Sequence, residues 1–120
     1  MNPSRRRIGL LLAAAACTLA LPAAHADTFP SKPITLVVPF AAGSGTDQMA
    51  RVFAQVMGDE AKVPIVVDNR GGASGFIAAQ YVAKAAPDGY TALITTNTTQ
   101  SANEHLFKKL PYDPVKDFAP

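Results

Sequence analysis

The 120-residue sequence contains no tryptophan, two histidines and a single cysteine, Cys17. The cysteine and one histidine lie within the first 26 residues, so residues 27–120 hold only His105 and no cysteine. That segment therefore has no disulfide, no thiolate nucleophile and no cysteine-ligated metal site. A site built from other ligands needs several His, Asp or Glu residues at ligand spacing, and Asp47 and Asp68 show no such spacing. We expect no metal and no cofactor.

Residues 27–120 also lack an excess of positive charge. Of the 11 Lys and Arg residues, the three at residues 5–7 precede this segment, which leaves eight against all nine Asp and Glu residues. The formal charge of residues 27–120 is therefore −1. Because nucleic-acid-binding domains present clustered positive charge, we expect no nucleic acid partner.

The first 26 residues have the pattern of a signal peptide. The three arginines precede an apolar run over residues 8–21, and Ala24-His25-Ala26 offers small residues at both positions that signal peptidase recognises. A membrane-spanning helix needs about 20 apolar residues, and this run is shorter. We predict cleavage before Asp27 and a periplasmic location. Export through the twin-arginine route and lipid attachment at Cys17 stay open as variants of this prediction.

Three short apolar segments predict β-strands, at residues 34–38, 65–67 and 90–94. They are rich in β-branched residues and do not alternate with polar residues, which is typical of buried parallel strands. A loop of small or polar residues follows each segment, at residues 41–45, 68–75 and 95–99. The remaining turns are expected at residues 59–62 and 87–89.

Helical periodicity follows each loop. Thr46 or Asp47 is the expected N-cap of a first helix that ends near Gly58, and further helices are expected over residues 77–85 and 101–109. Phe53 and Tyr81 are expected to lie in the core. Because strand, loop and helix recur three times, the sequence predicts an α/β fold with a right-handed βαβαβ layer and a parallel sheet.

The three loops are the candidate binding site, because ligands bind beyond the carboxyl ends of the strands in open parallel sheets. Small residues let backbone N–H groups approach a ligand, and helix N-termini favour an anion. Arg70 is either a clamp for a carboxylate or a partner in a structural salt bridge. Turn formation alone explains the same residues equally well. Neutral donors stand in the loops at Ser44, Thr46, Ser74, Thr96, Asn97 and Thr98.

A dinucleotide-binding domain is one alternative use of the first loop. Gly43-Ser44-Gly45 follows a strand, and Asp68 ends the next strand about 20 residues further on, as that motif requires. However, Gln48 occupies the position where close packing of helix and strand needs a third glycine. An exported α/β enzyme is the other alternative, with Ser44 or Ser74 as nucleophile and His105 as base. Neither serine lies in a Gly-x-Ser-x-Gly motif, so we expect that the protein is not an enzyme.

Six segments in order resemble the substrate-binding (Bug) proteins of tripartite tricarboxylate transporters. The resemblance extends over residues 29–120, which is nearly all of the chain after the predicted signal peptide. Its motifs are FPSKPI (29–34), VVPF (37–40), GSGTD (43–47), VVDNR (66–70), VAKAAPDGY (82–90) and LPYDPVKDFAP (110–120).

The resemblance implies a periplasmic-binding-protein fold of type II, with two lobes that close like a venus flytrap. Residues 27–120 would form the first βαβαβ part of the first lobe. The implied function is to bind a small organic carboxylate and deliver it to the membrane permease subunits. We assign Asp47 to capping the helix or to orienting its loop, because its charge would repel a carboxylate. The positions that match the family's ligand-binding loops are Phe40, Ala42, Gly43, Ser44, Gly45, Thr46, Asp47, Gly72, Ala73, Ser74, Gly75, Thr96, Asn97 and Thr98.

Overall fold

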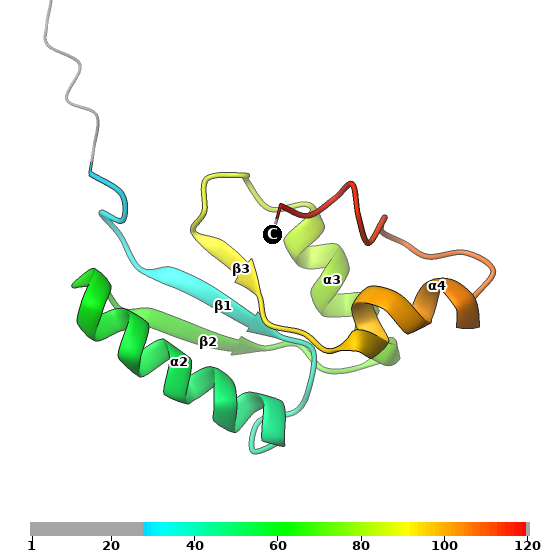
Figure 1. Cartoon of the computed structure of the whole chain (residues 1–120), viewed down its shortest axis with the longest axis horizontal. Helices are drawn as coiled ribbons and strands as arrows, with labels where there is room; N and C mark the ends of the chain where they lie inside the picture. The colour runs from blue at the N-terminus through cyan, green and yellow to red at the C-terminus, as the bar shows by residue number, and fades with distance from the viewer. Residues whose placement is uncertain (1–27, 120) are drawn as a thin grey trace, which may run out of the picture.

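A computed structural model describes residues 28–119. The predicted signal peptide and its cleavage site lie outside the described residues. Figure 1 shows a small sheet with its helices, and the order of the elements confirms the repeated strand–loop–helix pattern. The elements are β1 (Ile34–Val38), α2 (Gly45–Ala61), β2 (Ile65–Asn69), η2 (Ala73–Gly75), α3 (Phe76–Ala83), β3 (Thr91–Leu93), η3 (Thr98–Ala102) and α4 (Asn103–Leu106).

The three strands form one parallel sheet in the order β2-β1-β3. β1 pairs with β2 from Ile34 opposite Ile65 to Val38 opposite Asn69, and with β3 over Thr35 to Val37. Four of the five residues of the central strand are buried, because it has a neighbour on each side and a helix on each face. Its unbroken apolar sequence fits this position.

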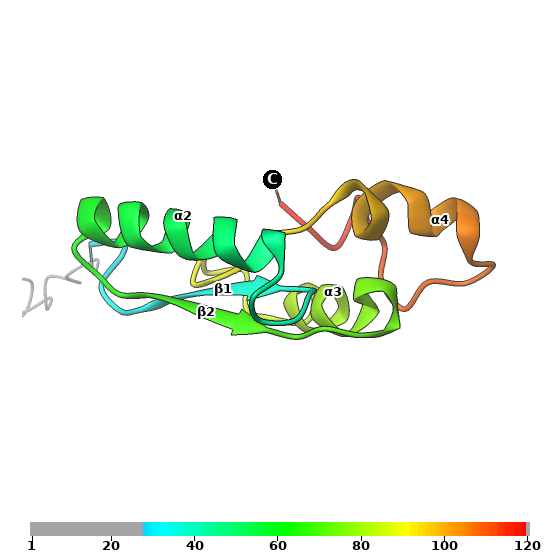
Figure 2. The same ribbon diagram turned by 90° about the horizontal axis from the view of Figure 1, so that it is seen from below.

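The two longer helices cover opposite faces of the sheet: α2 lies along one face and α3 on the other (Figure 2). Leu36 and Val38 of β1 pack with Ala50 of α2 in the core. On the other side of the sheet, Ala78 and Ala79 of α3 are fully buried. Alanines at these positions allow both helices to approach the strands closely. Among the helices of residues 28–119, none combines the length and hydropathy that crossing a membrane requires.

The prediction that Phe53 and Tyr81 lie in the core is wrong. Their exposed fractions are 49% and 39%, and the sheet is covered instead by Ala50 and Ala54 of α2. Periodicity finds an apolar stripe on α2, but the larger residues of that stripe lie on a side of the helix that the sheet does not reach. The exposed members of the stripe are Met49, Val52, Phe53, Val56 and Met57.

Several element boundaries also differ from the predictions, and α3 and β3 end before the predicted residues 85 and 94. α2 continues through residues 59–61 and ends with Lys62 in a left-handed conformation, where a turn was expected. β2 continues through Asp68 and Asn69, because both residues pair with β1. The third helical segment begins at Thr98 with a wide turn and ends at Leu106, so residues 107–109 are not helical.

Candidate functional site

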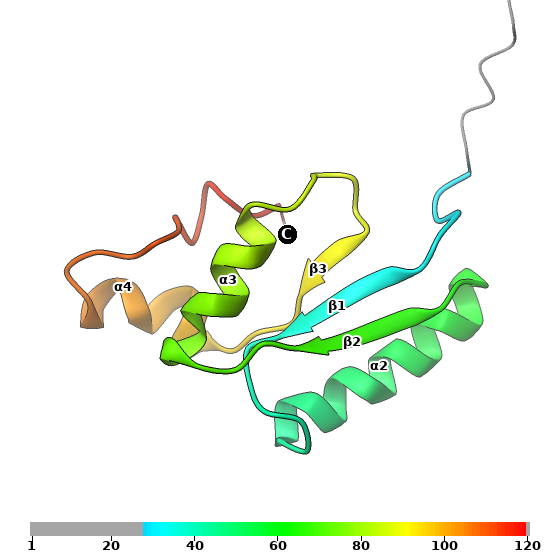
Figure 3. The ribbon, with the colours of Figure 1, turned by 180° about the vertical axis from the view of Figure 1, so that it is seen from behind.

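The loops that follow the three strands lie at one end of the sheet. We call them loop 1 (residues 39–44), loop 2 (residues 70–75) and loop 3 (residues 94–97). Viewed from behind, the three strand arrowheads point to the side where α2, α3 and η3 begin (Figure 3). Because β1 is central, the chain leaves it toward β2 on one side and returns to β3 on the other, which makes the carboxyl ends of β1 and β3 a topological switch point.

Loop 2 lies in close contact with loop 1 at one end and with η3 at the other. A Cβ atom at Gly71 would lie 3.4 Å from the backbone nitrogen of Ala41, so loop 2 passes directly beside loop 1. At its other end, a Cβ atom at Gly75 would overlap the hydroxyl of Thr99 in η3. The structure therefore brings the three predicted loops together.

Ser44, not Thr46 or Asp47, is the N-cap of α2. Its Oγ accepts a hydrogen bond from the backbone N–H of Asp47 at 3.2 Å. The Asp47 carboxylate reaches back and accepts the backbone N–H of Gly43 at 2.8 Å. This arrangement is close to a capping box, in which the first and fourth residues of a helix start satisfy each other's N–H groups. The Ser-x-x-Asp spacing of residues 44–47 is the sequence signal that identifies it.

Asp47 is the acidic residue in the first turn of α2, and its side chain is buried. Its residue is 2% exposed, although it was expected among the ligand-binding positions. Beyond Gly43, its oxygens accept Arg51 Nε at 3.0 Å and Asn69 Nδ2 at 2.9 Å. The hydrogen bond from Arg51, followed by those from Gly43 and Asn69, lowers the pKa of Asp47 to about 2 from the usual 3.8. The carboxylate is therefore charged at neutral pH and is directed into the loop.

Two backbone N–H groups at the start of α2 have no acceptor among residues 28–119. The N–H groups of Gly43, Ser44, Asp47 and Gln48 are all used within loop 1 and the first turn, whereas those of Gly45 and Thr46 are not. Gly45 is exposed and Thr46 half-buried. Because α2 has 17 residues, its dipole adds partial positive charge at these groups. The start of α2 therefore offers hydrogen-bond donors and partial positive charge to an anion.

Loop 2 contributes an exposed turn of small residues. Gly72 has a φ of +115° and Gly75 a φ of +87°, which L side chains rarely adopt. Gly72, Ala73 and Ser74 are exposed, but Gly75 is buried beneath η3, so its expected contact with a ligand is corrected to a packing role. Arg70 is engaged structurally: its Nε donates to Asp68 at 2.8 Å, and its guanidinium lies 3.5 Å from the Tyr81 ring centre.

Loop 3 and η3 combine exposed and buried polar groups. Asn97 and Thr98 are exposed, whereas the Thr96 hydroxyl is buried. Of the two remaining expected positions, Ala42 is exposed, whereas Phe40 is half-buried and packs against the core cluster, so it shapes loop 1 from beneath. Five buried polar atoms have no hydrogen-bond partner among the described residues: Thr95 Oγ1, Thr96 Oγ1, Thr99 Oγ1, Gln100 Oε1 and Asn103 Oδ1.

Two of the side chains considered for catalysis, Ser44 and His105, have other partners. Ser44 Oγ serves as the helix cap, and His105 lies 3.3 Å from its neighbour Glu104 on an exposed part of α4. Asp68, which a dinucleotide site would use, is paired with Arg70. Residues 28–119 contain no cluster of three or more His, Cys, Asp or Glu side chains that is able to hold a metal ion.

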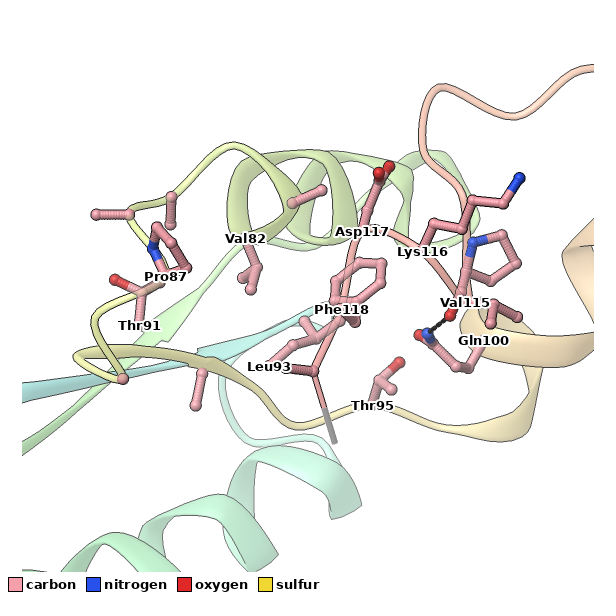
Figure 4. Close-up of a pocket in the computed structure, with 17 residues that line it drawn as sticks. Val82, Pro87, Thr91, Leu93, Thr95, Gln100, Val115, Lys116, Asp117 and Phe118 are labelled. Atoms are coloured by element: carbon pink, nitrogen blue, oxygen red, sulfur yellow. Dashed lines mark hydrogen bonds between the residues drawn. The ribbon is translucent and has the colours of Figure 1, made fainter.

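A separate hollow of about 1150 Å³ lies beside β3, between the end of α3 and residues 114–119 (Figure 4). Val82, Leu93 and Phe118 give it an apolar wall, and Gln100 Nε2 donates to the Pro114 carbonyl at one end. Thr95 is its one lining residue from the three loops. The hollow follows the open edge of the sheet and is distinct from the loop cluster.

Comparison with known proteins identifies relatives of this fold. Residues 49–120 match the profile of tripartite tricarboxylate transporter family receptors. The chain is 41% identical over 114 residues to BugT of Bordetella pertussis, which covers 94% of this chain and 34% of BugT. It therefore spans about a third of the length of the curated relatives that it matches.

Two solved structures with bound ligands are similar to the chain. One is MatC from Rhodopseudomonas palustris with bound malate, at 46% identity and a TM-score of 0.73, covering 77% of this chain and 31% of MatC. The other is an R. palustris protein with adipate, at 43% identity and a TM-score of 0.69, covering 72% of this chain and 29% of that protein. The prediction of a periplasmic-binding-protein α/β fold is confirmed.

Proposed function

Because the chain belongs to the tripartite tricarboxylate transporter receptor family, we propose that its full protein is a receptor that binds a small organic carboxylate in the periplasm. One observation carries this proposal: at the start of α2, beside the switch point of the sheet, the N–H groups of Gly45 and Thr46 lack an acceptor among residues 28–119. The malate and adipate of the similar structures are both carboxylates and support the same ligand class.

The chemistry of loop 1 fits a carboxylate held by neutral donors. Two adjacent N–H groups at a helix start match the two oxygens of a carboxylate, and the helix dipole favours its charge. The Ser44 hydroxyl uses a lone pair to cap α2, so its proton is available to a ligand. The Thr46 hydroxyl is a further donor at the same place. Neutral donors hold the anion without a buried counter-charge, which would be costly to desolvate.

Loops 2 and 3 complete the proposed site from either side of loop 1. Gly72, Ala73 and Ser74 are exposed and have little bulk, so a ligand is able to reach the loop 2 backbone. Asn97 and Thr98 offer an exposed amide and hydroxyl from the side of β3. The rest of the ligand would be enclosed by parts of the longer protein, because the solved relatives are about three times as long as the part that matches.

The proposed partners are the permease subunits of a tripartite tricarboxylate transporter. A receptor for such a transporter works outside the cytoplasm, which agrees with the signal-peptide pattern of residues 1–26. We expect cleavage before Asp27. Amino-terminal sequencing of protein isolated from the periplasm tests this expectation, and an intact Met1 or a lipid on Cys17 would contradict it.

The binding function is tested on the full-length protein by calorimetry. Malate, adipate and citrate are titrated, with dimethyl adipate as a matched neutral control. We expect saturable binding of at least one carboxylate and none of the diester. Each bound compound is then incubated with the protein and followed by NMR, and we expect no conversion. Binding of the diester as tightly as adipate, or steady turnover, would contradict the proposal.

A further inference from the structure

The hydrogen-bond network around Asp47 connects three separate parts of the candidate site. Its carboxylate accepts hydrogen bonds from the backbone N–H of Gly43 in loop 1, from Arg51 Nε one turn further along α2, and from Asn69 Nδ2 at the end of β2. Asn69 Nδ2 also donates to the Phe40 carbonyl at 3.2 Å, and its Oδ1 accepts Arg51 Nη2 at 3.2 Å. The carboxylate, the amide and the guanidinium therefore form a closed ring of contacts beneath loop 1.

This network fixes which backbone groups of loop 1 face outward. Gly43 has a φ of +85°, and its N–H is turned inward onto the Asp47 carboxylate. Gln48 Nε2 holds the carbonyl of the same residue at 3.1 Å. Gly43 is therefore held on both sides where the chain enters α2, and among residues 28–119 the next free N–H groups, those of Gly45 and Thr46, have no acceptor.

The charge of Asp47 has the wrong sign for direct contact with an anion. At 2% exposure its oxygens are turned away from solvent, and the Arg51 guanidinium offsets their charge. A negative charge close to a carboxylate site weakens binding unless it contributes more through geometry than it costs through repulsion. The two effects have opposite signs, so a single substitution distinguishes them.

We propose that Asp47 is a positioning residue of the carboxylate site: with Asn69 it holds loop 1 so that the Gly45 and Thr46 N–H groups point at the ligand. The proposal rests on the proposed function. It assigns to Asn69, which lies 22 residues away in the sequence, a part in a site that it does not touch.

Asp47→Asn in the full-length protein is the first test, with malate and adipate as probes. It removes a negative charge and also replaces an acceptor of Asn69 and Arg51 by an amide. We expect affinity to fall about tenfold or more, the size of effect that loss of a charge-assisted hydrogen bond produces. Affinity equal to or above that of the parent would overturn the proposal, because Asp47 would then be only a nearby like charge.

Asn69→Ala is the second test and leaves the net charge unchanged. It removes the donor to both Asp47 and Phe40, and we expect affinity to fall about threefold to tenfold. Unchanged affinity would overturn the role of the network. Because Asn69 is at the end of a strand and only half-buried, this variant keeps the proposal testable if Asp47→Asn does not fold.

Two controls separate positioning from charge and from stability. Asp88→Asn removes an equal charge from the turn before β3, at the opposite end of the sheet. Ala54→Gly destabilises α2 on its sheet-facing side without touching loop 1. For both we expect affinity within about twofold of the parent. The charge at Asp88 is remote and screened by salt. Ala54→Gly lowers stability, but the affinity is measured on protein that is folded. A loss in either control equal to that of Asp47→Asn would overturn the proposal.

The amide resonance of Gly43 gives a readout that does not need a ligand. In full-length protein labelled with ¹⁵N-glycine, the peak is assigned by its loss in Gly43→Ala. We expect Asp47→Asn to shift it upfield and to speed its exchange with solvent, because the hydrogen bond to a carboxylate is lost. An unchanged Gly43 peak would overturn the proposal. If the parent binds neither malate nor adipate, the proposed function is contradicted. The Gly43 resonance would still show whether the Asp47 network holds loop 1.

Discussion

Loop 1 and the region of loop 3 with η3 differ in how their polar groups are satisfied. In loop 1 the carboxylate of Asp47, the hydroxyl of Ser44 and the amide of Asn69 all have partners within the chain. In the other region, hydroxyls of Thr95, Thr96 and Thr99 are buried without one among residues 28–119. Both follow neighbouring parallel strands, so topology alone does not explain the difference.

The difference indicates which loop is preformed. A buried polar group without a partner costs about 1–3 kcal/mol, so the chain gains little from holding loop 3 in one conformation by itself. Loop 1 is held by contacts within one strand–helix unit and the end of the adjacent strand. We therefore expect the start of α2 to present its N–H groups before a ligand arrives, and the buried hydroxyls of loop 3 and η3 to stay without a partner until the ligand binds.

The largest expected effect comes from the contact between loop 2 and η3. Gly75→Ala places a Cβ atom onto the Thr99 hydroxyl, at a φ of +87°. We expect a loss of about 3 kcal/mol in the free energy of unfolding, from overpacking and backbone strain together. Gly43→Ala is the matched control, because its φ is +85° but no atom of residues 28–119 lies within 4 Å of the added Cβ.

We expect Gly43→Ala to lower the free energy of unfolding by about 1 kcal/mol, because it adds backbone strain without overpacking. Denaturant unfolding of both variants in the full-length protein measures the difference. Equal losses would show that η3 does not pack on Gly75 as described.

A smaller effect is expected at the cap of α2. Ser44→Ala removes the acceptor of the Asp47 N–H, and we expect a loss of about 1 kcal/mol in the free energy of unfolding. Ser44→Gly should cost only a few tenths of a kcal/mol, since glycine is tolerated at an N-cap. If the alanine variant is as stable as the parent, loop 1 is not held by its cap.

The acidic side chain of loop 1 predicts a pH dependence. The pKa of Asp47 is lowered to about 2 in the folded protein, so its contribution to stability is complete above the usual value of 3.8 and is lost as the pH falls toward 2. The stability difference between the parent and Asp47→Asn should therefore shrink over that range. A difference that stays constant from pH 5 to about 2 would contradict the lowered pKa.

Other carboxylates titrate in the same range without obscuring this result. The pKa values of Asp88 and Asp113 are lowered, first by backbone hydrogen bonds from Tyr90 and from Lys116 respectively. Both carboxylates are present in the parent and in the variant, so their contributions cancel in the difference.

The smallest effect is expected in the η3 region. Thr99→Val replaces a buried hydroxyl that has no partner among the described residues by a methyl group of similar size. We expect the free energy of unfolding to stay within about 0.5 kcal/mol of the parent or to rise. A loss of more than about 1 kcal/mol would show that the hydroxyl has a partner in the full-length protein and would remove the contrast with loop 1.

Much of this fold is predictable because it depends on local patterns. The strands, the first two helices and their loops follow from runs of β-branched residues, small-residue loops and helical spacing. The burial of Phe53 and Tyr81 was predicted wrongly, because periodicity does not reveal which side of a helix meets the sheet. The sequence pattern places Asp68 and Asn69 in a loop, because their pairing depends on the register with β1.

In the candidate site too, contacts between residues close in sequence are predictable, and contacts between distant residues are not. The Ser-x-x-Asp cap and the Asp47–Arg51 pair, four residues apart, have sequence signals. Asn69 has none, because its contact with Asp47 exists only after β1 and β2 have paired. Nor does the sequence reveal that Gly75 is buried, since its neighbour Thr99 comes from a different loop.

The central claim, that a carboxylate binds at the start of α2, is tested most directly by Gly45→Val in the full-length protein. Within the described part of the chain, no atom lies within 4 Å of a Cβ added at Gly45, and its φ is ordinary, so the fold should tolerate the larger side chain. The valine would stand beside the two N–H groups that have no acceptor. Calorimetry with malate and adipate, and circular dichroism as a check of the fold, should show unchanged structure and abolished binding. Binding as tight as that of the parent would place the site elsewhere.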